Sequence, residues 1–544
     1  MKGTQMYSPV QTIPPSCRTF IVSFTTCALL LVSACNWTEL VTVNNAGEQG
    51  TVGGYSPSLS GDGRYVAFTS GSDNLVEDDT NAQDDVFVRD TLNGSITRVS
   101  VDSAGNQANH LSRYPAISAD GRYVSFSSWA SNLVPNDTND NPDLFLHDRD
   151  TGTTTRISVD SAGNQSTQNQ AFGPEDIISD ISADGRYVSF VSRDYGLTDI
   201  DAEFKDVFVH DRVTATTTLM SVSNEGWSQF YDSYASSISA DGRYVAFSSD
   251  GDTLIPNDTN YFSDIFVRDQ DTGTITVVSV NSDGIQANYY NSAPSISGDG
   301  RYVAFVSSAS NLDPIYPNSA PSGIYVHDRV TGTTTPVSVN NEGAPANASC
   351  REPVISPDGR YVVFGSDATN LVPEDTNSAQ DIFVRDTVAG TTWRVSLDAA
   401  GNQANGPSST HALSADSRYV AFITSATNLF PNDTNGSWDV VIRALPQLSI
   451  TSVLPDTLSV GVTTPVTVTG TNFLPGTTPA LDAEISNVVI VDEQTITLDV
   501  TVPLGTENGT HDLSVYLKGT GPGQGRGVTA RCKDCVTFTG SPGC

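Results

Sequence analysis

Paired aspartates recur along the sequence at a spacing that could hold a cation. Each pair consists of the first residue of an Asp-Thr-Asn triplet and a second aspartate six residues later. The five pairs are Asp79 and Asp85, Asp137 and Asp143, Asp258 and Asp264, Asp375 and Asp381, and Asp433 and Asp439. Ca²⁺ prefers oxygen ligands of this kind, so calcium is the candidate cofactor of these loops.

The same residues have a second interpretation, which we favour. Asp, Thr and Asn side chains often hydrogen-bond to their own backbone in tight turns. The spacing also differs from that of an EF-hand loop. Two other copies of this loop lack the Asp-Thr-Asn triplet. In one, Asp201 stands in place of the triplet's aspartate, and in the other, residues 311–323 have no acid at that site.

These loops belong to a unit that is repeated seven times. The string Asp-Gly-Arg-Tyr-Val, with Ser for Gly in the last copy, recurs at intervals of 57 to 64 residues. It starts at Asp62, Asp120, Asp184, Asp241, Asp299, Asp358 and Asp416. Because Asp and Gly favour tight turns, we expect these seven aspartates to be structural turn residues.

Each unit contains four short runs of β-forming residues. In the second unit they are residues 116–118, 123–127, 144–147 and 155–159, and turns with Asp and Gly join the first pair and the last pair. Four antiparallel strands per unit, repeated in a ring, are typical of a β-propeller blade. The sequence therefore predicts an all-β protein with a seven-bladed propeller.

The two ends of the repeat array predict how the ring closes. The seventh unit ends after Asp439–Arg443 and lacks a fourth strand. Residues 38–49 match the fourth strand of the first unit and its trailing loop, residues 96–107. We expect the N-terminal strand to complete the last blade, since ring closure protects sheet edges.

The repeat resembles that of TolB-type propellers. Residues 356–364, Ser-Pro-Asp-Gly-Arg-Tyr-Val-Val-Phe, and residues 381–386, Asp-Ile-Phe-Val-Arg-Asp, carry the resemblance. The N-terminal domain of TolB has no counterpart here, so its role in the Tol–Pal system is not implied. Some related propellers are polysaccharide lyases that hold a metal with His and Gln, so His110 and His411 are the catalytic alternative.

The order of the strands assigns the loops to two ends of each blade. The loops before the first strand and between the second and third strands share one end, which we predict to be a binding face. At the other end, Arg64 and Asp90 should form a structural ion pair, as should their equivalents in other units. His147, His210 and His327 alternate with Arg89, Arg268 and Arg385 in the repeat, so we interpret these histidines as surface partners, not metal ligands.

The N-terminus reads as an export signal. An apolar run at residues 19–34 ends in Val32-Ser33-Ala34-Cys35, which resembles a bacterial lipobox. The resemblance implies that residues 1–34 are removed, that Cys35 is lipidated, and that the protein is anchored to a membrane. Asn36 after the cysteine is compatible with outer-membrane sorting, facing the periplasm or the exterior.

Residues 447–544 form a separate region. Residues 448–456 and 466–473 resemble the IPT/TIG immunoglobulin-like fold, which implies a small β-sandwich. Cys532, Cys535 and Cys544 lie within the last 13 residues, and an exported protein favours a disulfide among them, with the pairing left open. We therefore divide the chain into a signal peptide (1–34), a propeller (35–446) and an IPT/TIG domain (447–544).

Charge limits the class of partner. The chain has 62 acidic and 27 Lys and Arg residues, a formal net charge of −35, so it should not bind nucleic acid. It also lacks the Gly-x-Ser-x-Gly motif of α/β-hydrolases. We expect a lipid-anchored binding or scaffold protein of the cell envelope, with a protein or glycan ligand, and not an enzyme.

Overall fold

The computed structural model describes most of the chain. The described residues are 38–139, 141–165, 177–193, 196–200, 204–227, 231–256, 258, 260–314, 321–431, 433–446, 449–471, 477–492, 495–518 and 527–539. The predicted signal peptide, Cys35, Asp201 and Cys544 lie outside them. Contacts divide the chain into two compact units, one that contains Thr38–Leu445 and one that contains Pro446–Leu517.

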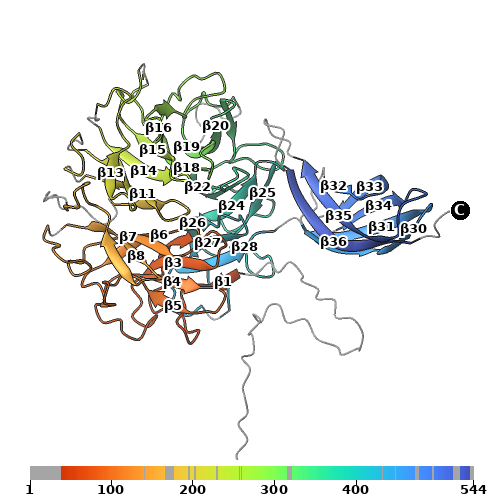
Figure 1. Cartoon of the computed structure of the whole chain (residues 1–544), viewed down its shortest axis with the longest axis horizontal. Coiled ribbons are helices and arrows are strands. Elements are labelled where there is room, and N and C mark those ends of the chain that lie inside the picture. Colours follow the sequence, from red (N-terminus) through yellow and green to blue (C-terminus); the bar gives the residue numbers. More distant parts are fainter. Residues whose placement is uncertain are drawn as a thin grey trace, which may run out of the picture. The chain divides into compact units, whose positions relative to one another are not determined.

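The structure is all-β: within the described residues every regular element is a strand (Figure 1). The described residues contain no helix that is long and apolar enough to cross a membrane. Strands of the first unit form four-stranded antiparallel sheets, and all but one of these sheets consist of four consecutive strands in chain order. Short runs such as Tyr65–Ser70 suit strands because aromatic and β-branched residues pack well on a pleated surface.

The first four sheets follow one another along the sequence. They are β2 (Tyr55–Leu59), β3 (Tyr65–Ser70), β4 (Asp85–Asp90) and β5 (Ile96–Arg98); β6 (Ser112–Ile117), β7 (Tyr123–Ser128), β8 (Asp143–Asp148) and β9 (Thr153–Arg156); β10 (Ser179–Ile181), β11 (Tyr187–Ser192), β12 (Asp206–Asp211) and β13 (Thr216–Leu219); and β14 (Ser233–Ile238), β15 (Tyr244–Ser249), β16 (Asp264–Asp269) and β17 (Ile275–Val277).

Three further sheets complete the described part of this unit. They are β18 (Asn291–Ile296), β19 (Tyr302–Ser307), β20 (Gly323–Asp328) and β21 (Thr333–Pro336); β22 (Cys350–Ile355), β23 (Tyr361–Ser366), β24 (Asp381–Asp386) and β25 (Thr391–Arg394); and β26 (Ser408–Leu413), β27 (Tyr419–Thr424) and β28 (Asp439–Ala444) with β1 (Thr38–Leu40). The N-terminal strand thus pairs with the last sheet, as the repeat predicted: Thr38 lies opposite Arg443 and Leu40 opposite Val441.

The fourth strand of the second sheet is shorter and begins earlier than the sequence suggested. In the second sheet β9 covers Thr153–Arg156, whereas the pattern of residues predicted 155–159. Pairing ends there because the side chain of Ser158, instead of continuing the ladder, accepts a hydrogen bond from the Leu144 backbone N–H at 3.1 Å. The bounds of this strand therefore differ from the prediction, whereas the order of the strands in the sheet agrees with it.

The apolar cores lie between successive sheets. One cluster joins Val86 and Val88 of β4 to Val124 and Phe126 of β7, and the same arrangement is repeated between later neighbours. Each sheet buries both faces against its two neighbours, which is the packing of β-propeller blades.

Backbone hydrogen bonds link the sheets at the end that carries the β2–β3 type of turn. Gly61 N–H donates to Ala119 O, Ala119 to Ala183, Ala183 to Ala240, Ala240 to Gly298, and Gly298 to Pro357, all at 2.8–3.0 Å. Asp416 N–H then donates to Gly61 O at 2.8 Å and returns the series to its first sheet. Pro357 is the one member of this series that has no N–H to donate.

The second unit contains two four-stranded sheets. One has the order β29 (Ser449–Leu454), β31 (Thr463–Thr471), β34 (Thr495–Thr501) and β33 (Glu484–Asp492); the other has the order β30 (Thr457–Ser459), β36 (Gly527–Thr539), β35 (Gly509–Lys518) and β32 (Thr477–Ala480). Both sheets contribute to one apolar core, in which Val468 and Leu498 of the first meet Val515 and Phe538 of the second. The two sheets therefore form a sandwich.

Candidate functional site

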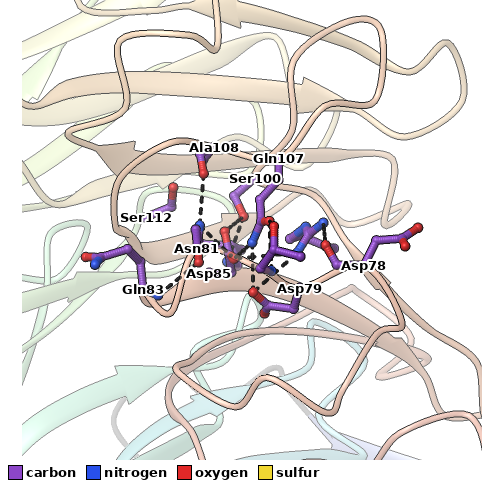
Figure 2. Close-up of polar contacts among 12 residues, drawn as sticks. Asp78, Asp79, Asn81, Gln83, Asp85, Ser100, Gln107, Ala108 and Ser112 are labelled. Carbon is purple, nitrogen blue, oxygen red and sulfur yellow. Dashed lines mark hydrogen bonds and ion pairs between the residues drawn. The ribbon is translucent and has the colours of Figure 1, made fainter.

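The first aspartate pair lies where two loops of the first sheet meet. Asp85 begins β4, Asp79 lies in the loop before it, and Gln107 lies in the loop that leads from β5 to the next sheet. Gln107 Nε2 donates to Asp79 Oδ1 at 2.8 Å and to Asp85 Oδ2 at 2.9 Å (Figure 2). The amide therefore joins the β3–β4 loop to the β5–β6 loop, and both loops lie at the same end of the sheet, as predicted.

A guanidinium group accompanies the carboxylates in three sheets. Arg98 Nη1 of β5 lies 3.7 Å from both Asp79 Oδ1 and Asp85 Oδ2. Arg156 is placed in the same way beside Asp137 and Asp143, and Arg394 beside Asp375 and Asp381, at 3.3–3.6 Å. One cationic side chain already offsets part of the negative charge of the two acids at each of these three pairs, which disfavours calcium there.

The other two pairs have an apolar residue at the position of the arginine. Val277 replaces it beside Asp258 and Asp264, and Leu40 replaces it beside Asp433 and Asp439. Burial raises the pKa of Asp264 to about 6 and also raises the pKa of Asp258. Calcium binding stays a prediction, and these are the two pairs to which it best applies.

The second aspartate of each pair also holds the outermost strand. Ser100 Oγ donates to Asp85 Oδ1 at 2.5 Å, and neither side chain is exposed. Equivalent bonds of 2.5–2.6 Å join Ser158 to Asp143, Ser221 to Asp206, Ser279 to Asp264, Ser396 to Asp381 and Thr42 to Asp439. These serines and the bridging glutamines were not predicted from the sequence, although both recur at fixed positions in the repeat.

The opposite end of the sheets is held by the seven turn aspartates. Ser60 Oγ and the Arg64 backbone N–H both donate to Asp62 Oδ1, at 2.8 and 3.0 Å. The same two bonds occur at Asp120, Asp184, Asp241, Asp299, Asp358 and Asp416. These aspartates therefore cap the turns that carry the inter-sheet backbone bonds.

Ion pairs join the same turns to the third strand of each sheet. Their nitrogen–oxygen distances are 2.5–2.8 Å, and the pairs are Arg64–Asp90, Arg122–Asp148, Arg186–Asp211, Arg243–Asp269, Arg301–Asp328 and Arg360–Asp386. The hydrogen bond from Arg243 lowers the pKa of Asp269 to about 2. Because Arg64 is 38% exposed whereas Arg360 is 6% exposed, the pairs differ in how far water screens them.

The interpretation of three histidines as surface residues is wrong. His147, His210 and His327 are only 5–7% exposed. His147 Nδ1 lies 2.9 Å from Thr154 Oγ1, which donates its own proton to Val101 O of the preceding sheet at 2.5 Å. The histidine must therefore donate through Nδ1, and the group links neighbouring sheets. Arginine takes the same position in other copies: the buried Arg89 donates through Nη1 to Val43 O at 3.2 Å, and the half-buried Arg268 donates through Nη1 to Val222 O.

The two histidines of the catalytic alternative have different surroundings. His110 is exposed, and its ring lies 6.2 Å from that of Trp129. His411 of β26 is 7% exposed and lies close to Glu352, and burial lowers its pKa.

The cysteines of the second unit are free thiols where they are described. Cys532 and Cys535 both lie in β36 and are not joined to each other; Cys535 Sγ donates to the Cys532 carbonyl at 3.3 Å. A disulfide with Cys544 stays a prediction, since Cys544 lies outside the described residues.

Comparison with solved structures finds β-propellers. A proposed TolB of Agrobacterium tumefaciens has 17% identity and a TM-score of 0.34, and covers 65% of this chain and 95% of its own. The periplasmic gluconolactonase PpgL of Pseudomonas aeruginosa has 18% identity and a TM-score of 0.30, with 62% and 82% covered. The WD40 repeats of RRP9 have 7% identity and a TM-score of 0.39, with 75% and 96% covered. No family model and no curated protein matches the chain.

Proposed function

We propose that this chain is an exported, lipid-anchored binding protein of the bacterial cell envelope. A seven-bladed propeller presents its loop face to a protein or glycan ligand, and an IPT/TIG domain of the immunoglobulin-like class follows it. The series of seven sheets in the described residues and the pairing of β1 with β28 support the blade count. The two-sheet sandwich after Pro446 supports the second domain.

The observation that carries the proposal is a difference between the two ends of the sheets. At the turn end, each copy repeats the same capped turn and all but the last repeat the Arg–Asp pair. At the loop end, side-chain bonds such as Gln107 to Asp79 join the loops to one another, while the exposed side chains differ from copy to copy. A rigid scaffold with varied exposed side chains is suited to recognition.

Membrane attachment is a separate element of the proposal. It depends on Val32-Ser33-Ala34-Cys35, and we expect Cys35→Ser to abolish lipid labelling and to move the chain from the membrane fraction to the soluble fraction. A Cys27→Ser variant is the control, because that cysteine lies within the apolar run. Labelling that persists in Cys35→Ser would contradict the anchor.

A metal-dependent polysaccharide lyase is the alternative. Burial of His411 within β26 favours binding over this alternative, because a catalytic group must touch its substrate. The lyase predicts release of unsaturated product from polysaccharide, which stops with a chelator and with His110→Ala.

The proposal is tested with the full-length mature chain immobilised on a surface and exposed to separated protein and glycan fractions of the envelope. We expect retention of one fraction without turnover, and competition by the soluble chain. Loss of retention in loop-face variants that keep their melting temperature identifies the face. The proposal is overturned if every loop-face variant retains the fraction as the wild type does, or if the chain releases unsaturated product from polysaccharide.

A further inference from the structure

Three aromatic rings pack together on the loop face where the fourth and fifth sheets meet, and a fourth aromatic residue precedes one of them in the chain. Phe262 comes from the β15–β16 loop, and Tyr289 and Tyr290 come from the β17–β18 loop. Their three ring centroids lie 4.8–5.0 Å apart, with interplanar angles of 42°, 72° and 83°. Tyr289 is 46% exposed and Tyr290 53%, and Tyr261, next to Phe262 in the chain, is 83% exposed. We call these four residues the aromatic platform.

The repeat shows that the fold does not require these rings. The positions of Tyr261 and Phe262 hold Ala82 and Gln83 in the first copy and Ser378 and Ala379 in the sixth. The positions of Tyr289 and Tyr290 hold Ala348 and Ser349 in the fifth copy and Gly406 and Pro407 in the sixth. Since these copies form the same sheets and loops, packing alone does not explain four large rings at one junction.

Tyr261 adds an energetic argument. Its φ is 56°, in the left-handed region, where the equivalent positions carry Ala82, Ser378 and Gly436 with φ of 52°, 53° and 61°. The turn is held by Asn260 Oδ1, which accepts a hydrogen bond from the Phe262 N–H at 2.8 Å. A bulky residue is disfavoured at such a position, and strain of this kind is concentrated at functional sites.

We infer that the aromatic platform binds a ring of a neutral saccharide, an inference that rests on the proposed function and names the ligand class of the loop face. The face of an aromatic ring carries negative charge density, which attracts the C–H groups on the flat side of a sugar ring. The three tyrosine hydroxyls both donate and accept hydrogen bonds, as sugar hydroxyls require. A net charge of −35 disfavours acidic polysaccharides, and the platform has no charged side chain of its own to pair with a cationic sugar, so the saccharide that we infer is neutral.

The test measures binding of five neutral pentasaccharides (xylo-, cello-, manno-, malto- and N-acetylchito-pentaose) to the full-length mature chain by calorimetry. The variant combines Tyr261→Ala, Tyr289→Ala and Tyr290→Ser, which copies residues from sibling loops and so should keep the fold. We expect at least one saccharide to bind and its Kd to rise by about tenfold or more in the variant. Trp227→Asn is the control, because Trp227 is 72% exposed on another loop of this face and its equivalent is Asn106.

The outcomes separate this inference from the proposed function. Equal affinity in the wild type and the triple variant overturns the platform and leaves a glycan-binding face intact. Binding of none of the saccharides, together with retention of an envelope protein that the triple variant loses, overturns the neutral saccharide as ligand but supports a binding face. A triple variant that loses its cooperative thermal transition is replaced by Tyr289→Ala alone, with the same criteria.

Discussion

Thr42 and Asp439 are separated by 397 residues, yet Thr42 Oγ1 donates a hydrogen bond of 2.6 Å to Asp439 Oδ1. The bond is the counterpart of Ser100 to Asp85 within the first sheet. Next to it, the backbone N–H of Val41 donates a hydrogen bond to Val440 O at 2.8 Å. The N-terminal residues therefore take the place of a fourth strand that the seventh copy lacks.

Removal of this strand should weaken the whole ring. Deletion of residues 38–44 removes β1, the fourth strand of the last sheet, and exposes the edge of β28. We therefore expect the melting temperature of the first unit to fall by about 10 °C or more. Thr42→Val should cost about 1–3 kcal/mol, because it leaves the unexposed Asp439 with one donor fewer. Calorimetry measures both effects, and an unchanged transition after the deletion contradicts ring closure.

The backbone bonds between sheets predict a matched pair of proline effects. Ala240→Pro removes the donor to Gly298 O, and Pro357 occupies the same position in the sixth copy, so the backbone already accommodates proline there. We expect the free energy of unfolding to fall by about 1 kcal/mol.

The control is Ala240→Ser, which keeps the N–H. Thermal unfolding compares the two variants under the same conditions. If Ala240→Pro and Ala240→Ser have equal stability, the inter-sheet bond contributes nothing measurable.

The repeated motifs predicted most of the architecture. Asp-Gly-Arg-Tyr-Val marks a turn with a following strand wherever it occurs, so its spacing predicts the sheets, and the match of residues 38–49 to 96–107 predicts β1 beside β28. Local turn chemistry and alternation are encoded within single copies, which is why a single sequence reveals them.

Contacts between copies could not be predicted in this way. His147 looked exposed because arginine alternates with it, but it is buried against Thr154, which bonds to Val101 of the preceding copy. Arg89 is buried at the equivalent position and itself donates to Val43 O. Within one copy, the placement of Arg98 beside Asp79 and Asp85 joins β5 to the β3–β4 loop, and the spacing along the chain does not specify this contact. The aromatic platform was missed because it combines the β15–β16 and β17–β18 loops, which are separated in the sequence by two strands.

Val277→Arg should stabilise the fourth sheet in a pH-dependent way. The native pKa of Asp264 is about 6 against an ordinary value of 3.8, so the bound proton stabilises the native state at low pH, and this contribution is lost as the pH rises through about 6. A guanidinium at position 277, placed like Arg98, should favour the carboxylate. We expect a melting temperature about 2 °C above wild type at pH 7.5 and no gain at pH 4.5.

Val277→Leu is the control for this change, since it alters size without charge. Differential scanning calorimetry at the two pH values measures the difference. A gain of equal size at pH 4.5 and pH 7.5 contradicts the assignment of the effect to Asp264.

Two glycines in different turns of the second sheet allow the cost of backbone strain to be measured apart from the cost of a close contact. Gly121 has a φ of 74°, and a Cβ atom there would lie 2.2 Å from Tyr65 Cδ2, whereas Gly152 has a φ of 72° and no atom within 4 Å of that position. Gly152→Ser should therefore cost only the left-handed backbone penalty, about 1 kcal/mol, and Gly121→Ser should cost at least about 2 kcal/mol.

The seventh copy provides the reverse substitution, because Ser417 stands where the others have glycine and has a φ of 59°. Ser417→Gly relieves a backbone penalty of about 1 kcal/mol but adds freedom to the unfolded chain, which costs about 0.5 kcal/mol. We expect a net gain of about 0.5 kcal/mol in calorimetry. Equal losses in Gly121→Ser and Gly152→Ser would show that Tyr65 moves aside freely, and the contact between successive sheets would then contribute little to stability.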